Sequence, residues 1–279
     1  MSVRQIGKIK ALTDNPDFVP GIFNYCDKWC ERCPFTARCS VFAMQADDAN
    51  AVESRDPRNE AFWKQLHGTL ASTVELLREM AEEAGVDLDT VVSPEDEART
   101  ARVLSETKAH PLLTAATDYT MAVYNWFESS KELFEDKAKE VNMKARMDLP
   151  GTDPQAEVVD LQDATEVVRW DHTLIGAKIR RAIQQGLTGR PSCLDGLPKD
   201  SDGSARVALV CIDRSMAAWT RIRKHLPEQG DEILDFLAAL ERLRRETERI
   251  FPEAQLFVRP GIDDQGTGPQ PNQTMSGTS

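Results

Sequence analysis

Four of the chain's six cysteines lie within fourteen residues, with the spacing C-x3-C-x2-C-x5-C. They are Cys26, Cys30, Cys33 and Cys39. Thiolates are ligands of zinc and of iron–sulfur clusters. In a reducing compartment, clustered thiols bind metal more often than they form disulfides. We therefore expect these four residues to ligate a metal centre.

The short separations between the four cysteines favour an iron–sulfur cluster of the [4Fe-4S] type. A cuboidal cluster takes one thiolate on each of four neighbouring irons, which suits closely spaced ligands. Structural zinc sites usually consist of two ligand pairs separated by a longer loop, so zinc is the second choice. Residues 18–42 also hold six of the eighteen aromatic residues, which would shield such a centre from water. These are Phe18, Phe23, Tyr25, Trp29, Phe35 and Phe42.

The segment Cys30-x2-Cys33-x5-Cys39 resembles the auxiliary-cluster (SPASM-type) segments of some radical S-adenosylmethionine enzymes. This resemblance covers ten residues and implies cluster chemistry without implying an activity. Cys26-x3-Cys30-x2-Cys33 also matches the spacing of the main cluster of those enzymes. However, Cys39 supplies a fourth thiol, and Arg32 stands where those enzymes usually carry an aromatic residue. The pattern of their α/β barrel is also absent, so we reject this second match. No family is recognised over the whole chain.

Composition sets limits on the class of protein. Of 279 residues, 41% are hydrophobic and 29% are charged, which is typical of a globular chain. The net charge of −12 argues against nucleic acid and anionic membranes as partners. The first residues lack an apolar signal segment, and no apolar run is long enough to span a membrane. We expect a cytoplasmic protein with an unknown redox or protein partner.

The rest of the chain has the apolar spacing of amphipathic helices, with proline at several expected first turns. The expected helices cover 57–84, 93–109, 111–146, 155–186, 204–226 and 229–250. The predicted fold is all-α, an antiparallel bundle of about five or six long helices with an irregular N-terminal cysteine-rich metal-binding segment. We divide the chain into that segment (1–46), the bundle (47–260) and a disordered tail (261–279). The connection 186–204 is predicted to be a long loop, with its role left open.

The first expected helix has a seam of residues at alternating steps of three and four, which predicts close packing along neighbouring helices. Its members are Trp63, Leu66, Leu70, Thr73, Leu77, Met80 and Ala84. On the helix over 155–186, His172 occupies a seam whose other members are apolar or small. We interpret it as a hydrogen-bonded core histidine. A role as a ligand or as an acid–base group is the second choice.

Asp213 and Arg214 interrupt an apolar helix and are expected to form a buried ion pair, so His172, Asp213 and Arg214 together make a possible second polar site. Three functions follow from these patterns. The first is an iron–sulfur protein that transfers electrons or senses redox state. The second is a non-catalytic helical interaction protein stapled by zinc. The third is a redox enzyme with a site near His172 in the bundle interior.

Overall fold

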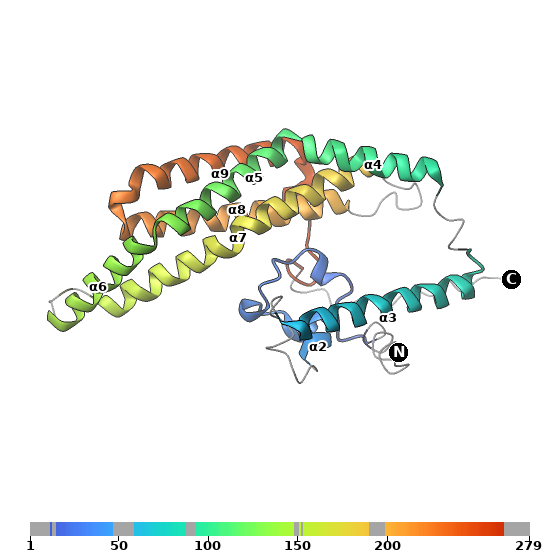
Figure 1. Ribbon diagram of the computed structural model, residues 1–279, viewed down its shortest axis with the longest axis horizontal. Helices are drawn as coiled ribbons and strands as arrows, with labels where there is room; N and C mark the ends of the chain where they lie inside the picture. The colour runs from blue at the N-terminus through green and yellow to red at the C-terminus, as the bar shows by residue number, and fades with distance from the viewer. Residues whose placement is uncertain are drawn as a thin grey trace. The chain divides into compact units, whose positions relative to one another are not determined.

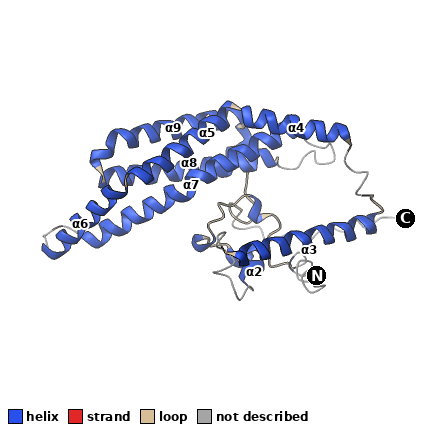
Figure 2. Cartoon of the chain, in the orientation of Figure 1, coloured by secondary structure: helices blue, strands red, loops and turns tan. Residues whose placement is uncertain are grey.

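The computed structural model describes residues 12, 15–46, 59–87, 93–147, 151, 153–189 and 199–264. Within those ranges every regular element is helical, with eight α-helices and several short 3-10 turns and no strand (Figures 1 and 2). The prediction of an all-α protein is confirmed. Among the helices described, none is both long enough and apolar enough to cross a membrane.

The chain forms two compact units. Unit 1 combines Met1–Arg99 with Val258–Ser279, and unit 2 is Thr100–Phe257. The division falls inside helix α4 (Pro94–Ala109). Unit 1 therefore contains both ends of the chain. Residues 258–264 belong to the same unit as the cysteine segment, although the 158 residues of unit 2 separate them from Arg99 in the sequence.

Unit 2 is built from helices that pack along one another (Figure 1). They are α5 (Pro111–Ser129), α6 (Lys131–Met147), α7 (Pro154–Thr188), α8 (Asp200–His225) and α9 (Gly230–Ile250). The most extensive contact joins α7 to α8, while α9 contacts both α8 and α5. The 3-10 turn η7 (Pro252–Leu256) packs against α8 and α9.

Aromatic rings fill the centre of unit 2. Trp219 is fully buried, stacks on Phe236 with ring centroids 4.6 Å apart, and meets Trp126 edge to face at 5.0 Å. Its indole N–H donates to the hydroxyl of Tyr119 at 3.0 Å. The buried face of α9 is the predicted one and consists of Ile233, Phe236, Leu240, Leu243 and Thr247.

Two helices differ from the prediction at their ends. The helix expected over 111–146 is two helices, because Ser130 leaves the helical conformation (φ −94°, ψ 12°). The carbonyl of Trp126 accepts from both the Ser129 hydroxyl and the Ser130 amide, and a side chain that bonds back to the backbone in this way bends a helix. Helix α7 continues past Gly186 to Thr188, since the glycine with positive φ that ends it is Gly189 (φ 76°, ψ 177°).

The predicted loop over 186–204 is shorter than expected. Its first residues are the end of α7, and α8 begins at Asp200 instead of at 204. Residues 190–198, which include Cys193, lie outside the described part of the chain. Cys211 is fully buried in α8.

The described part of unit 1 contains helices α2 (Ser40–Ala46) and α3 (Glu60–Ala84) and three 3-10 turns. Helix α3 begins at an Asn59 cap, whose side chain accepts from the amide of Ala61, and it ends at Gly85 in the left-handed conformation. The predicted seam of this helix is not a packing face. Its large apolar side chains are exposed, from Trp63 at 57% to Met80 at 54%.

Candidate metal centre

The four cysteines are placed by three consecutive 3-10 turns, η1 (Ile22–Asn24), η2 (Cys30–Arg32) and η3 (Thr36–Arg38). Cys26 follows η1, Cys30 begins η2, and Cys33 and Cys39 end η2 and η3 with amide-to-carbonyl bonds onto Cys30 and Thr36. The short sequence spacing is thus converted into four side chains on one wall.

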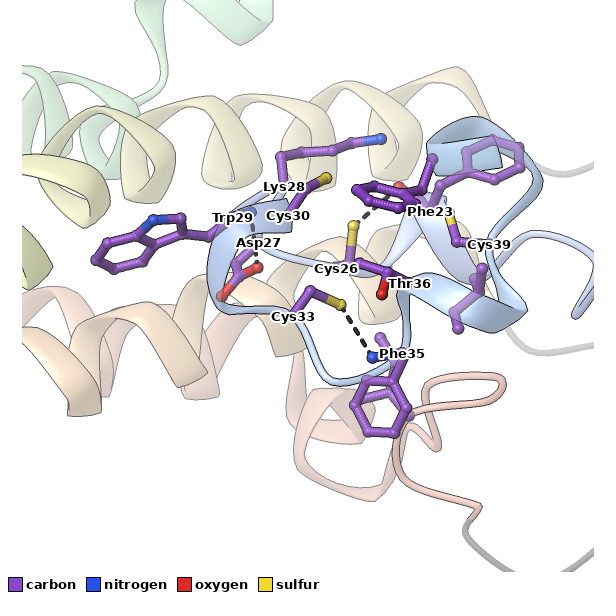
Figure 3. Close-up of a pocket in the computed structure, with 13 residues that line it drawn as sticks. Phe23, Cys26, Asp27, Lys28, Trp29, Cys30, Cys33, Phe35, Thr36 and Cys39 are labelled. Atoms are coloured by element: carbon purple, nitrogen blue, oxygen red, sulfur yellow. Dashed lines mark hydrogen bonds between the residues drawn. The ribbon is translucent and has the colours of Figure 1, made fainter. Parts of the chain in front are cut away.

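All four cysteines line a single pocket of unit 1 (Figure 3). The rest of its lining is mostly apolar and includes Ile22, Phe23, Trp29, Phe35, Phe42 and Ile262. Ile22 and Trp29 are buried, and the cysteines themselves are half-buried with free thiols. Soft sulfur donors within apolar walls suit iron–sulfur clusters and zinc, because both bind thiolates.

Two of the sulfur atoms already have backbone partners (Figure 3). The Cys26 thiol donates to the carbonyl of Phe23 at 3.5 Å, and the amide of Phe35 donates to Cys33 Sγ at 3.4 Å. An N–H directed at sulfur stabilises a thiolate and tunes the potential of a bound cluster. The Phe35 amide therefore favours a thiolate at Cys33.

The electrostatics of the pocket oppose uncompensated negative charge. Burial raises the pKa of the Cys30 thiol, and its neighbours Cys26, Cys33 and Cys39 raise it further. Burial also raises the pKa of Cys33, while the Phe35 amide acts in the opposite direction. A bound metal reverses this balance, because its positive charge favours the thiolates.

The backbone between the first two cysteines is strained. Lys28 has φ 60°, and it is the one residue other than glycine with positive φ among those described. Asp27 Oδ1 accepts from the amide of Trp29 at 3.0 Å, which fixes this tight turn. The Lys28 ammonium lies 5.4 Å from the Phe23 ring, and the Arg32 guanidinium stacks 4.2 Å from the Trp29 ring. Strained residues held by such contacts are concentrated at functional sites.

Residues 258–264 of unit 1 contribute Ile262 to the pocket wall, a feature that sequence reasoning missed. Gly261 has φ 70°, and a Cβ added there would meet Val19 Cγ1 at 2.9 Å and Ile22 Cδ1 at 3.0 Å. Ile262, the next residue, lines the pocket. An ion pair between Arg259 and Asp263 at 2.7 Å closes the turn that carries both. The Pro260-Gly261 pair and the apolar Ile262 were the signals that could have revealed it.

The three residues of the possible second polar site, His172, Asp213 and Arg214, each contact other partners and do not form one site. Arg214 pairs with Asp171, which is fully buried, through Nε at 2.8 Å and through Nη2. Asp213 is 59% exposed and lies 3.5 Å from Arg244. The buried ion pair is therefore made by Asp171, which the sequence reading overlooked. Asp171 lies on the same helical stripe as Val168 and Ile175, so its position could have indicated burial.

His172 is half-buried, and its Nδ1 faces two carbonyls of its own helix, those of Arg169 at 2.8 Å and Val168 at 3.2 Å. Burial lowers the pKa of the imidazole, partly offset by those two carbonyls. These contacts hold the ring against its own backbone. They do not bring it to Asp213.

Within the described ranges, no group of three or more His, Cys, Asp or Glu side chains is arranged to hold a metal ion. The four thiols share one pocket without being gathered as a ligand set. The four thiols therefore match a metal or cluster in their chemistry and in lining the same pocket, but not in their spacing in the structure. No protein-family model, curated protein or solved structure matches the chain.

Proposed function

We propose that Cys26, Cys30, Cys33 and Cys39 bind a [4Fe-4S]-type cluster, and that the protein transfers electrons or senses redox state in the cytoplasm. The observation that carries this proposal is the single apolar pocket lined by all four thiols. When bound, such a cluster supplies a one-electron redox couple whose potential depends on burial and on hydrogen bonds to sulfur. The protein's own contribution is to hold, shield and tune it.

Individual residues supply these contributions. The Phe35 amide donates to Cys33 Sγ, which lowers the electron density on that sulfur and raises the potential of a cluster held there. Ile22, Trp29 and Ile262 limit the access of water to the pocket. The sequence separations of three, two and five residues favour a cluster over zinc, since paired zinc ligands are usually set farther apart.

A zinc-stapled interaction protein is the alternative. It is supported by the long-range contact between the cysteine segment and Gly261, because a structural ion at this place would fasten the two ends of unit 1 together. We propose no catalytic role for His172, because its Nδ1 is directed at the carbonyls of Arg169 and Val168. For unit 2 we keep the antiparallel bundle as the proposed arrangement, supported by the packing of α7, α8 and α9.

Anaerobic purification followed by iron, zinc and acid-labile sulfide analysis tests the function. We expect about four irons and four sulfides per chain, with a broad visible absorption that bleaches on reduction. Cys33→Ser should lower the iron content, whereas Cys211→Ser, in the core of unit 2, should leave it unchanged. A colourless protein with one zinc and no sulfide would establish the alternative, and a protein that takes up neither metal would refute both.

A further inference from the structure

Helix α3 turns its large apolar side chains to solvent. Six of them form a stripe along the helix with exposed fractions from 38% to 58%. They are Trp63, Leu66, Leu70, Val74, Leu77 and Met80. A contiguous apolar stripe of this length is unusual on a monomer and marks an interaction surface.

The less exposed side of α3 holds small residues beside Leu76. Ser72 is 2% exposed, and Gly68 and Leu76, one turn to either side of it, are half-buried. A helix packed only within its own chain shows the reverse pattern, with the large apolar residues inside. The orientation of α3 therefore leaves the face best suited to burial available for a partner.

We propose that this stripe pairs with the same stripe of a second copy of the chain, with the two α3 helices antiparallel. The steps from Trp63 to Ala84 alternate between three and four over three heptads, which is the repeat of a two-helix seam. Related by a twofold axis level with residues 71 and 72, the stripe is complementary to itself. Trp63 then faces the partner's Met80, Leu66 faces the partner's Leu77, and Leu70 faces the partner's Thr73.

The charge distribution of α3 favours the antiparallel direction for a pair of copies. The first half of α3 contains Glu60 and Lys64, one acidic and one basic residue. The second half contains Arg78 and four glutamates, Glu75, Glu79, Glu82 and Glu83, a net charge of −3. Parallel pairing would place the two acidic halves side by side, whereas antiparallel pairing places each against a neutral half.

Symmetric pairing of one patch with itself is the commonest way in which soluble chains associate. The proposal rests on α3 alone and does not depend on whether the cysteines bind a metal.

The association state of two matched variants tests the proposal. Leu77 and Leu104 are exposed to similar extents, 54% and 51%, on α3 and α4 respectively. We expect sedimentation equilibrium to give a dimer for the wild type and for Leu104→Glu, and at least a tenfold weaker dimer for Leu77→Glu. Circular dichroism should show equal helix content in all three, since neither side chain is buried in the protomer. A monomeric wild type, or equal weakening by both changes, would overturn the proposal.

Cross-linking then tests the direction of pairing. Leu66→Cys together with Leu77→Cys should give a disulfide between two chains, identified by mass spectrometry on mixed isotope-labelled protein. Within one helix these positions are about 16 Å apart, too far for a disulfide. Leu70→Cys alone should cross-link poorly, because only parallel pairing places it opposite itself. An efficient link between two copies of position 70, or a link from α3 to unit 2 of the same chain, would contradict the antiparallel dimer.

Discussion

The carbonyl of Gly261 accepts a hydrogen bond from Nη1 of Arg38 at 3.4 Å, across 223 residues of sequence. Arg38 ends the turn η3 next to Cys39, and its own carbonyl accepts from the amide of Val19 at 3.0 Å. One arginine thus joins the start of the cysteine segment to the last described residues of unit 1. Ile262, the residue after Gly261, lines the same pocket as the cysteines.

Replacing Gly261 with alanine should loosen that wall. The added Cβ would lie 2.9 Å from Val19 Cγ1 and 3.0 Å from Ile22 Cδ1, and alanine also resists φ 70°. We expect faster amide hydrogen exchange in residues 19–39 and, in metal-loaded protein, faster loss of metal to a chelator.

Gly85→Ala is the matched control for that change. Gly85 has φ 67° but no atom within 4 Å of the added Cβ, so only the conformational cost of about 1 kcal/mol applies. Exchange in residues 19–39 should stay at the wild-type rate. If both variants behaved alike, the close approach of Gly261 to Val19 and Ile22 would have no structural role.

Replacing Asp171 with asparagine should destabilise unit 2 by about 3 kcal/mol, because the Arg214 guanidinium would lose the buried carboxylate that compensates its charge. Urea unfolding followed by circular dichroism measures the change. Asp213→Asn, one residue from Arg214 but exposed, should cost less than about 0.5 kcal/mol. Equal effects would show that the Asp171–Arg214 pair does not stabilise the helix packing.

The helices of unit 2 were predictable because their signals are local. A proline at the first turn of α5 and of α7 and the apolar spacing of α9 are read directly from neighbouring residues. The break at Ser130 was not predictable in the same way, because it depends on which carbonyl two serines share. Neither serine is a helix breaker by itself.

The cysteines of the candidate site could be predicted from the sequence, but the distant residue that lines the pocket beside them could not. The cysteines are identified by spacing alone, whereas Ile262 joins them through a contact between the two ends of the chain. The apolar seam of α3 was correctly recognised as a pattern, but a pattern does not state which molecule covers it. The same limit explains why Arg214 was paired with its neighbour Asp213 and not with Asp171, which lies 43 residues away.

Lowering the pH should weaken unit 2 partly through His172. Burial holds the pKa of this imidazole below its usual 6.5. The unfolded chain therefore takes up a proton at a higher pH than the folded one does, and the free energy of unfolding falls as the pH drops below about 6.5. An NMR titration of the ring should give a midpoint below 6.5, and His172→Gln should make the loss of stability between pH 6.5 and 5 shallower. A midpoint above 6.5 would contradict the burial of the ring.

Removing the metal from loaded protein should release the cysteine segment without unfolding unit 2. Between residues 15 and 46, only Ile22 and Trp29 among the described side chains are buried, a core too small to fold by itself. A bound metal would supply much of the missing stability, because the ligands are brought together only in the folded state. After chelation, hydrogen exchange should rise in residues 19–42 and 258–264, while α7 and α8 keep their protection. Loss of protection in α8 would instead mean that the two units unfold together, and unchanged exchange near the cysteines would mean that their turns are stable without a ligand.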